Sequence, residues 1–236
     1  MNIVYVGAHQ DDEAQALGTF LKYRQQGGHQ LHLICTTNGD KGFSFDTETP
    51  HDVVAATRDR EIRAVAAALG ASYRCLGAPD EYLYDTPENR LKLIDALRAC
   101  QANLVFTTWV NDYNLDHTIT SQLVFQATML TIIASIQTEH PALKQTPRIY
   151  YCDPGPGFGF EGTHFVELSE EIVDKKVQII NLHESQMAIM RAIGADYAES
   201  FRELARQTGA RAGVPYAESF RPCLASRRTP LANMLP

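Results

Sequence analysis

Short apolar runs alternate with longer amphipathic stretches along most of this chain. The strand-like runs lie near residues 2–7, 31–37, 72–76, 103–108 and 147–152. Helical patterns separate them, near residues 12–27, 51–69, 87–101 and 118–138. This alternation is typical of right-handed βαβ units, in which helices pack on a parallel sheet. The pattern therefore predicts an α/β fold, a three-layer sandwich with a mostly parallel sheet.

Four segments depart from this alternation. Residues 39–50 are polar and carry two phenylalanines, which favours a loop that covers a substrate at the carboxyl edge of the sheet. Residues 153–162 hold two prolines and four glycines, so we expect irregular structure there, forming a wall of a pocket. From Ser169 the pattern is helical again, with a second helical stretch over about residues 185–207. The tail from Ser226 has few core residues, and we expect it to be loosely held.

Composition adds three constraints. A chain of 236 residues, 44% apolar and 21% charged, is long enough for one good-sized core, so we expect a single domain over residues 1–236. The net charge of −7 argues against a nucleic-acid partner. Five widely spaced cysteines without a C-x-x-C pair indicate reduced thiols in a cytoplasmic protein. No apolar stretch reaches transmembrane length, and the chain begins on a core strand rather than on a signal peptide.

The first strand ends in one imidazole and three carboxylates. His9 is followed by Asp11, Asp12 and Glu13. Clustered acids repel one another unless a proton or a cation offsets their charge. A helix N-terminus also favours acids, but capping alone does not explain the histidine in front of them. Histidine and aspartate supply the nitrogen and oxygen donors of an open zinc site, so we expect a metal here.

A third ligand is expected from a second strand end. The run at 103–108 is followed by a polar loop with Asp116 and His117, and then by a helical pattern. If these two strands are parallel neighbours, His9, Asp12 and His117 meet at one carboxyl edge, where open α/β sheets bind ligands. Asp11 then stays free of the metal, as a base for a metal-activated water.

Seven motifs follow one another along nearly the whole chain. They are Ala8-His9-Gln10-Asp11-Asp12-Glu13, Thr37-Asn38-Gly39-Asp40-Lys41-Gly42, Arg58 with Glu61 and Leu69-Gly70, Pro79-Asp80, Asn114-Leu115-Asp116-His117, His183-Glu184-Ser185-Gln186, and Tyr216 to Phe220. In this order they resemble the PIG-L/LmbE-like deacetylases, which are zinc-dependent N-deacetylases of molecules that contain N-acetylglucosamine. The resemblance implies a Rossmann-like, LmbE-like fold and a small-molecule N-acylated amino-sugar substrate.

The resemblance also implies roles for individual residues. By position, His9, Asp12 and His117 correspond to the zinc ligands, and Asp11 to the general base. Asp116 corresponds to an acid that orients a group of the site by hydrogen bonding. Two further residues, Arg58 and Asp80, correspond to positions near the sugar. The His/Asp ligand set also accepts other divalent ions, so the identity of the metal stays open.

Two residues depart from the family pattern. Gln10 replaces a proline, for which we expect little chemical effect. Asn114 replaces a histidine that serves as an acid or polarises the acyl carbonyl. An asparagine amide can donate a hydrogen bond to an oxyanion but cannot release a proton. Asp11 would then act as both base and acid, or Tyr113 would help.

Several alternatives stay open at this stage. The same site fits an amidase that acts on another acylated metabolite, and Asn114 also fits a catalytically impaired binding module on the same fold. A nucleotide-binding domain is disfavoured, because the first strand lacks the G-x-G-x-x-G turn. We expect Lys175 and Lys176 to be solvated and His183 to be structural. The sequence leaves the oligomeric state open, including a homo-oligomer.

Overall fold

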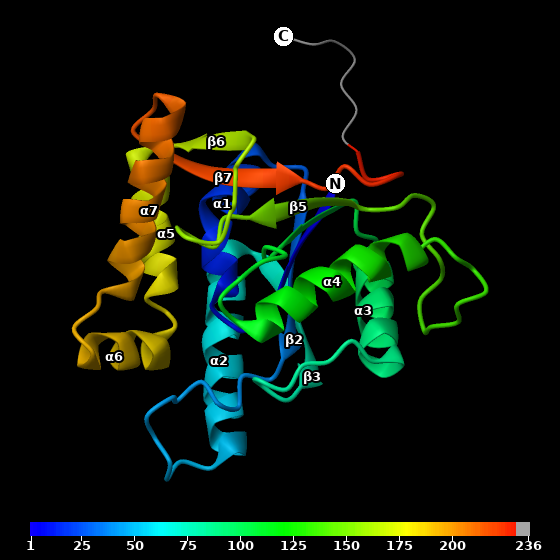
Figure 1. The fold of residues 1–236 in the computed structure, drawn as a ribbon, viewed down its shortest axis with the longest axis horizontal. Helices are drawn as coiled ribbons and strands as arrows, with labels where there is room; N and C mark the ends of the chain where they lie inside the picture. Colours follow the sequence, from blue (N-terminus) through cyan, green and yellow to red (C-terminus); the bar gives the residue numbers. More distant parts are fainter. Residues whose placement is uncertain (230–236) are drawn as a thin grey trace.

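The computed structural model describes residues 1–229, whose strands form one seven-stranded sheet with the order β3-β2-β1-β4-β5-β7-β6 (Figure 1). The strands are β1 (Asn2–Gly7), β2 (Gln30–Thr37), β3 (Ala71–Ala78), β4 (Leu104–Thr107), β5 (Arg148–Cys152), β6 (His164–Leu168) and β7 (Tyr216–Pro222). The first five pair in parallel, whereas β7 runs antiparallel to both β5 and β6. The predicted α/β fold with a mostly parallel sheet is confirmed.

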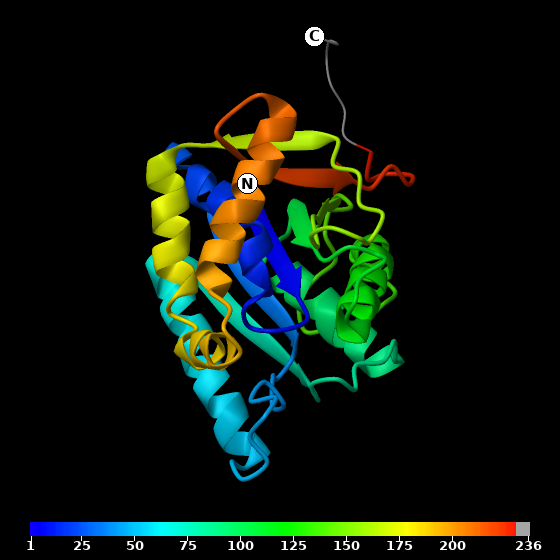
Figure 2. The same cartoon turned by 60° about the vertical axis from the view of Figure 1, so that its left-hand side comes forward.

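Helices cover both faces of the sheet, as Figure 2 shows. On one face lie α1 (Leu17–Gln26), α2 (His51–Leu69), α5 (Glu170–Ile180), α6 (Glu184–Ala192) and α7 (Tyr197–Ala212). On the other face lie α3 (Pro87–Ala99) and α4 (Leu115–Leu130). Side chains of a strand alternate between the two faces. Strands buried on both faces therefore appear in the sequence as continuous apolar runs, as β1, β2 and β4 do.

Two expected helices are shorter in the structure than in the sequence pattern. The stretch at 12–27 divides into a short 3-10 helix, η1 (Asp12–Gln15), and α1. The stretch at 118–138 ends at Leu130, because the buried Arg98 binds the carbonyl oxygens that follow. Its guanidinium donates to the main-chain oxygens of Thr131, Ile133 and Ile136 at 3.0, 2.9 and 2.8 Å. The apolar residues after Leu130 thus form a compact turn around one cation.

The C-terminal third differs most from the expectation. The stretch at 185–207 is two helices, α6 and α7, separated at Gly194, whose φ of 81° ends the first. Asp196 then caps α7 through the amide of Glu199. The strands β6 and β7 were not predicted, because a short antiparallel pair at a sheet edge carries a weak local signal. The motif from Tyr216 to Phe220 belongs to β7.

Lys176 is buried, so the prediction that it is solvated is wrong. Only 2% of its surface is exposed, and its Nζ lies 2.7 Å from Oε1 of Glu218. Glu218 also accepts hydrogen bonds from the amides of Gly18 and Thr19 at the start of α1. Lys175 is exposed, as expected. The two neighbours differ because Lys176 lies one helical turn after Ile172, on the face of α5 that meets the sheet.

The remaining expectations concern the cysteines, membrane segments and the tail. All five cysteines are unpaired thiols, of which Cys35, Cys152 and Cys223 are buried. None of the helices within residues 1–229 is long and apolar enough to cross a membrane. In the tail, Arg228 is buried and donates to the main-chain oxygen of Phe125, so residue 228 is held in place. Residues 230–236 lie outside the described residues.

Candidate metal centre

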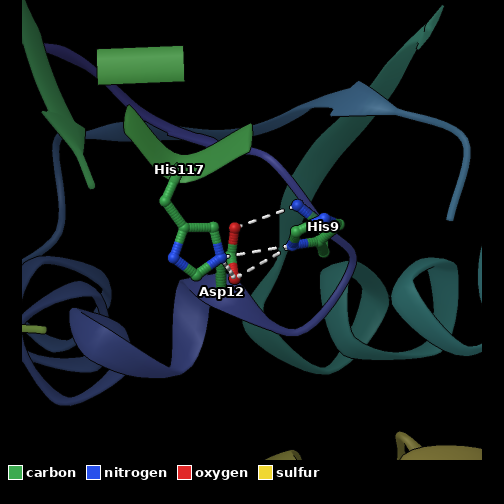
Figure 3. A group of neighbouring side chains, drawn as sticks. All are labelled: His9, Asp12 and His117. Atoms are coloured by element: carbon green, nitrogen blue, oxygen red, sulfur yellow. Dashed lines mark hydrogen bonds and ion pairs between the residues drawn. The ribbon is translucent and has the colours of Figure 1, made fainter. Parts of the chain in front are cut away.

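Three side chains from two strand ends meet at the carboxyl edge of the sheet (Figure 3). His9 lies two residues after β1, and Asp12 begins η1. His117 lies in the first turn of α4, which follows β4. Because β1 and β4 are parallel neighbours, their carboxyl ends lie side by side. The juxtaposition expected from the sequence is therefore present.

The donor atoms of these residues face one another. His9 Nδ1 lies 3.2 Å from His117 Nε2, which lies 3.1 Å from Asp12 Oδ1. The third separation, from His9 Nδ1 to Asp12 Oδ1, is 3.9 Å. Donors on a tetrahedral zinc ion are about 3.3 Å apart when the zinc–ligand bonds have their usual lengths. All three residues are buried, and Figure 3 shows the carboxylate between the two rings.

The chemistry of this donor set fits a divalent metal ion. Asp12 Oδ2 accepts hydrogen bonds from the amides of Ala8 and His9 at 2.7 and 2.9 Å, so its other oxygen is directed at the imidazoles. Two imidazole nitrogens and one carboxylate oxygen are the protein ligands of open, catalytic zinc sites. The structure therefore offers three preoriented ligands and leaves room for a further one.

Carboxylates also lie behind the two imidazoles. His9 Nε2 is 2.9 Å from Oδ1 of Asp80 and 3.6 Å from Oδ2 of Asp116. His117 Nδ1 is 2.9 Å from Oδ1 of Asp112. Carboxylates in this position orient histidine ligands and make them better donors. Asp112 was missed from the sequence; its only signal was a second acid, beside Asp116, in the loop before His117.

The negative charges of these carboxylates favour a positive charge at the centre. Burial alone would lower the pKa of His117, but Asp12 and Asp112 raise it to about 10. The pKa of His9 is likewise well above its usual value, because Asp116, Asp12 and Asp80 outweigh burial. Burial would raise the pKa of Asp12, but His117 and His9 hold it well below its usual range. Protons and a metal ion therefore compete for the same ring nitrogens.

Asp11 is not one of the three grouped donors and binds Arg58. Arg58 Nη2 donates to Asp11 Oδ1 at 2.6 Å. The second carboxylate oxygen of Asp11 makes no hydrogen bond to another described residue. Arg58 reaches this point because Gly42 leaves space for it; a Cβ on Gly42 would lie 2.5 Å from Arg58 Cδ. Gly42 therefore provides the space in which Arg58 lies.

Arg58 and Asp80, which the sequence places near the sugar, are both buried. Each is only 3% exposed. Arg58 binds Asp11, and Asp80 lies against His9 while it accepts the amide of Lys41 at 3.2 Å. In this structure both side chains are therefore committed to groups of the centre. Their contact with substrate stays a prediction.

Asn114 is the N-cap of α4. Its Oδ1 accepts hydrogen bonds from the amides of Asp116 and His117 at 2.7 and 3.4 Å. Its Nδ2 donates to Oε1 of the exposed Glu81 at 3.1 Å. Asparagine is among the preferred N-cap residues, because its oxygen satisfies amides that the helix leaves free. Asn114 thereby fixes the first turn of α4, which carries His117.

A cavity of about 380 Å³ borders Asp12 and His117. Its aromatic walls are Tyr113, Tyr197 and Phe201, and residues 153–156 form a further side. This confirms that the proline- and glycine-rich segment lines a pocket. Residues 39–50 do not line this cavity, in contrast to the expectation that they cover a substrate. The contribution of α7 was missed, because no local pattern shows which part of the sheet edge a distant helix faces.

Known proteins resemble the chain in sequence. The family model for GlcNAc-PI de-N-acetylase, PIG-L, matches residues 4–128, which is more than half of the chain and includes His9, Asp12 and His117. A 4-oxalmesaconate hydratase from Pseudomonas putida KT2440 is 27% identical over 156 residues. That match covers 63% of this chain but only 59% of the hydratase, less than two thirds of its length.

Solved structures extend the similarity over almost all of the fold. A conserved protein from Thermus thermophilus has a TM-score of 0.80 at 27% identity, covering 98% of this chain and 96% of its own. The 4-carboxy-2-hydroxymuconate hydratase from Pseudomonas putida KT2440 has a TM-score of 0.82 at 22% identity, and the match covers 98% of this chain and 99% of the hydratase. The N,N'-diacetylchitobiose deacetylase from Pyrococcus horikoshii has a TM-score of 0.81 at 22% identity, and the match covers 94% of this chain and 83% of the deacetylase. The last two comparisons establish a shared fold.

Proposed function

Since this chain belongs to the GlcNAc-PI de-N-acetylase family, PIG-L, we propose that it is a metal-dependent hydrolase acting on amino sugars. It removes an acyl group, acetyl in the simplest case, from the amide nitrogen of an N-acetylglucosamine-type sugar or of a conjugate. The observation that carries this proposal is the convergence of His9, Asp12 and His117, while Asp11, the residue before Asp12, stays outside the donor set and binds Arg58.

In this proposal His9, Asp12 and His117 hold one zinc ion. Zinc, when bound, polarises the acyl carbonyl and lowers the pKa of a water molecule. The chain itself supplies the orientation of the ligands: the carboxylates of Asp80 and Asp112 lie against the outer nitrogens of the two imidazoles. The same ligand set accepts other divalent ions, so metal content has to be measured.

Asp11 moves the proton. The oxygen that is not bonded to Arg58 takes a proton from the attacking water and returns it to the departing nitrogen, so one carboxylate serves as base and then as acid. Arg58 keeps this carboxylate in place through a charge-assisted hydrogen bond. A two-way role for Asp11 is needed because Asn114 has no proton to release at the position of the family histidine.

Asn114, as a proposed catalytic residue, and Asp116, as a positioning residue, complete the proposed site. Asn114 Nδ2, which binds the exposed Glu81, exchanges that partner for the acyl oxygen and stabilises its developing charge as a neutral donor. Asp116 is fully buried and lies 3.6 Å from His9 Nε2, and it fixes the loop before α3 by accepting the amide of Glu81. It acts by orienting His9 rather than by touching the substrate.

The cavity beside the centre supports an uncharged substrate. Among the described residues, no lysine or arginine lines it, whereas Asp12, Asp153 and Glu203 do. A substrate with several carboxylates would meet like charges there without a cationic side chain to compensate them. Neutral sugar rings pack well on aromatic side chains such as Tyr113 and Tyr197, which line the cavity. Arg58 and Asp80 would contact substrate only after leaving their present partners.

The test is a substrate panel with the zinc-loaded protein. N-acetylglucosamine, its β-glycosides and N,N'-diacetylchitobiose are incubated with the protein, and both acetate and new primary amine are measured. We expect equal amounts of the two products, loss of activity with chelator and recovery with zinc. A zinc-loaded protein that releases neither product from any member of the panel, or from other N-acylated metabolites, contradicts the proposal.

A second candidate is the addition of water to a carbon–carbon double bond of an unsaturated acid. It is favoured by the 27% identity to a hydratase and by Asn114, since hydration needs no acid for a leaving amine. The lack of cationic side chains around the cavity speaks against it. Incubation with an unsaturated oxo-diacid, followed by the loss of its ultraviolet absorbance, separates the two candidates.

A further inference from the structure

The start of α6, residues 183–186, contacts three separate segments around the candidate metal centre. His183 binds Glu13, which follows the proposed ligand Asp12. The side chain of Gln186 donates to the main-chain oxygen of Gly42 at 3.1 Å. Ser185 binds Glu61 on α2 through its amide and its hydroxyl, at 2.8 and 2.7 Å. We call residues 183–186 the junction segment.

Glu13 and His183 form a buried pair. His183 Nε2 lies 2.8 Å from Glu13 Oε1. The histidine is 0% exposed and the glutamate 3% exposed, and 170 residues of chain separate them. The other oxygen of this carboxylate, Glu13 Oε2, is buried and has no hydrogen-bond partner among the described residues. His183 is therefore the principal partner of a carboxylate that water cannot reach.

The three consecutive carboxylates of the β1–α1 turn point to three different partners. Asp11 binds Arg58, Asp12 faces the two imidazoles, and Glu13 binds His183. In the described structure η1 lacks a side-chain cap, and Tyr5 donates to the main-chain oxygen of Asp12 at 2.6 Å. The amides of Ala8 and His9 hold Asp12 Oδ2, and the contacts of Asp11 and Glu13 hold the backbone of the turn on either side of Asp12.

We propose that His183 is a positioning residue of the metal centre, which holds Glu13 so that Asp12 presents one oxygen to the metal and Glu13 stays out of the coordination sphere. This inference rests on the proposed ligand set. Without His183, Glu13 is a buried carboxylate without a partner, a costly state. The positive charges at this turn would be Arg58, which binds Asp11, and a bound metal ion, so a Glu13 released toward either of them would change the coordination geometry.

Two variants that differ by one methylene separate positioning from packing. In His183→Gln the amide nitrogen reaches about as far as the imidazole Nε2 and still donates to Glu13. In His183→Asn the amide is too short to do so. Glu13→Asp shortens the same contact from the other side and replaces His183→Asn if that variant does not fold. Val173→Ala removes buried volume from α5 without touching the turn and controls for general loss of stability.

The readouts are cobalt affinity, the visible absorption spectrum of bound Co²⁺, and Tm. We expect His183→Asn and Glu13→Asp to bind Co²⁺ about 10–100-fold more weakly and to shift its spectrum. His183→Gln keeps the affinity and spectrum of the parent, and Val173→Ala lowers Tm but leaves the spectrum unchanged.

Three results would overturn the inference. The first is a folded His183→Asn or Glu13→Asp protein with the affinity and spectrum of the parent. The second is equal weakening in the glutamine and asparagine variants, since the hydrogen bond to Glu13 would then not matter. The third is a parent protein that binds no cobalt, which would remove the proposed ligand set as well. A parent that binds cobalt but deacetylates nothing rejects the proposed function and leaves this inference standing.

Discussion

Arg58 donates a hydrogen bond of 2.6 Å to Asp11 across 47 residues of sequence. The contact joins α2 to the turn that follows β1 and fixes the carboxylate next to the proposed ligand Asp12. A charge-assisted bond of this kind is short and directional. It explains how one of three adjacent acids stays apart from the metal ligands, and it leads directly to two predictions.

Asp11→Asn should keep the metal and lose turnover. Asparagine has nearly the size of aspartate but cannot accept a proton, so the proposed base is removed while Asp12 is untouched. We expect kcat to fall by about 10²–10⁴-fold, the usual contribution of general acid–base catalysis. Metal content is measured by elemental analysis beside the rate. Parental turnover in the variant would exclude Asp11 as the base.

Arg58→Met should misplace Asp11 without removing it. The unbranched side chain fills much of the same space but donates no hydrogen bond. Small displacements of a catalytic group can cost about 10²-fold in rate, so we expect kcat to fall while bound metal is retained. Arg63→Met on the exposed face of the same helix is the control, and its rate should match the parent. Equal rates in both variants would mean that Arg58 does not position Asp11.

The metal-free protein should lose stability as the pH rises above neutrality. The pKa of His117 is about 10 in the folded protein, against an ordinary value of 6.5. Because the folded protein binds this proton more tightly than the unfolded chain, the protonated His117 contributes fully to the free energy of unfolding below pH 6.5. This contribution is lost as the pH rises toward 10. Zinc takes the place of the proton, so the zinc-loaded protein should lack this slope. Tm measured across this range with chelator and with zinc tests the difference; identical slopes would contradict it.

Asn114 combines a structural and a proposed catalytic role, which two substitutions separate. Asn114→Asp keeps the oxygen that caps α4 but removes the Nδ2 donor, so stability should stay near the parent while kcat falls. Asn114→Ala removes both groups and should cost about 1 kcal/mol of stability in addition. Urea unfolding and turnover are measured for each. An unchanged kcat in Asn114→Asp would exclude the catalytic role of the Nδ2 donor and leave Asn114 with its role as the N-cap of α4.

Lys176→Met should destabilise the protein strongly, because Glu218 then stays buried without its cation. Removing one partner of a buried pair typically costs about 3–5 kcal/mol. Lys175→Met, at the exposed neighbouring position, is the matched control and should change stability by less than about 0.5 kcal/mol. Urea unfolding gives the free energy of unfolding of the two variants. Equal free energies would show that the Lys176–Glu218 contact contributes little to stability.

Local patterns were sufficient for much of the fold. The helix expected over residues 51–69 has those bounds in the structure, and five strands lie within a few residues of their expected positions. Strands buried on both faces have long apolar runs, and amphipathic helices repeat at their own period, so both can be recognised from neighbouring residues alone. The pair β6 and β7 has a mixed pattern and depends on a partner strand far away in sequence.

The sequence by itself determined the α/β alternation and the residue types at two strand ends, where His9, Asp12 and His117 stand. Only the tertiary structure decided what those residues touch. Asp112 behind His117, Arg58 on Asp11 and His183 on Glu13 are contacts between segments that no local pattern links. The physical reason is that polarity along a chain records whether a side chain is buried, whereas the partner that satisfies a buried charge is fixed by packing of distant elements.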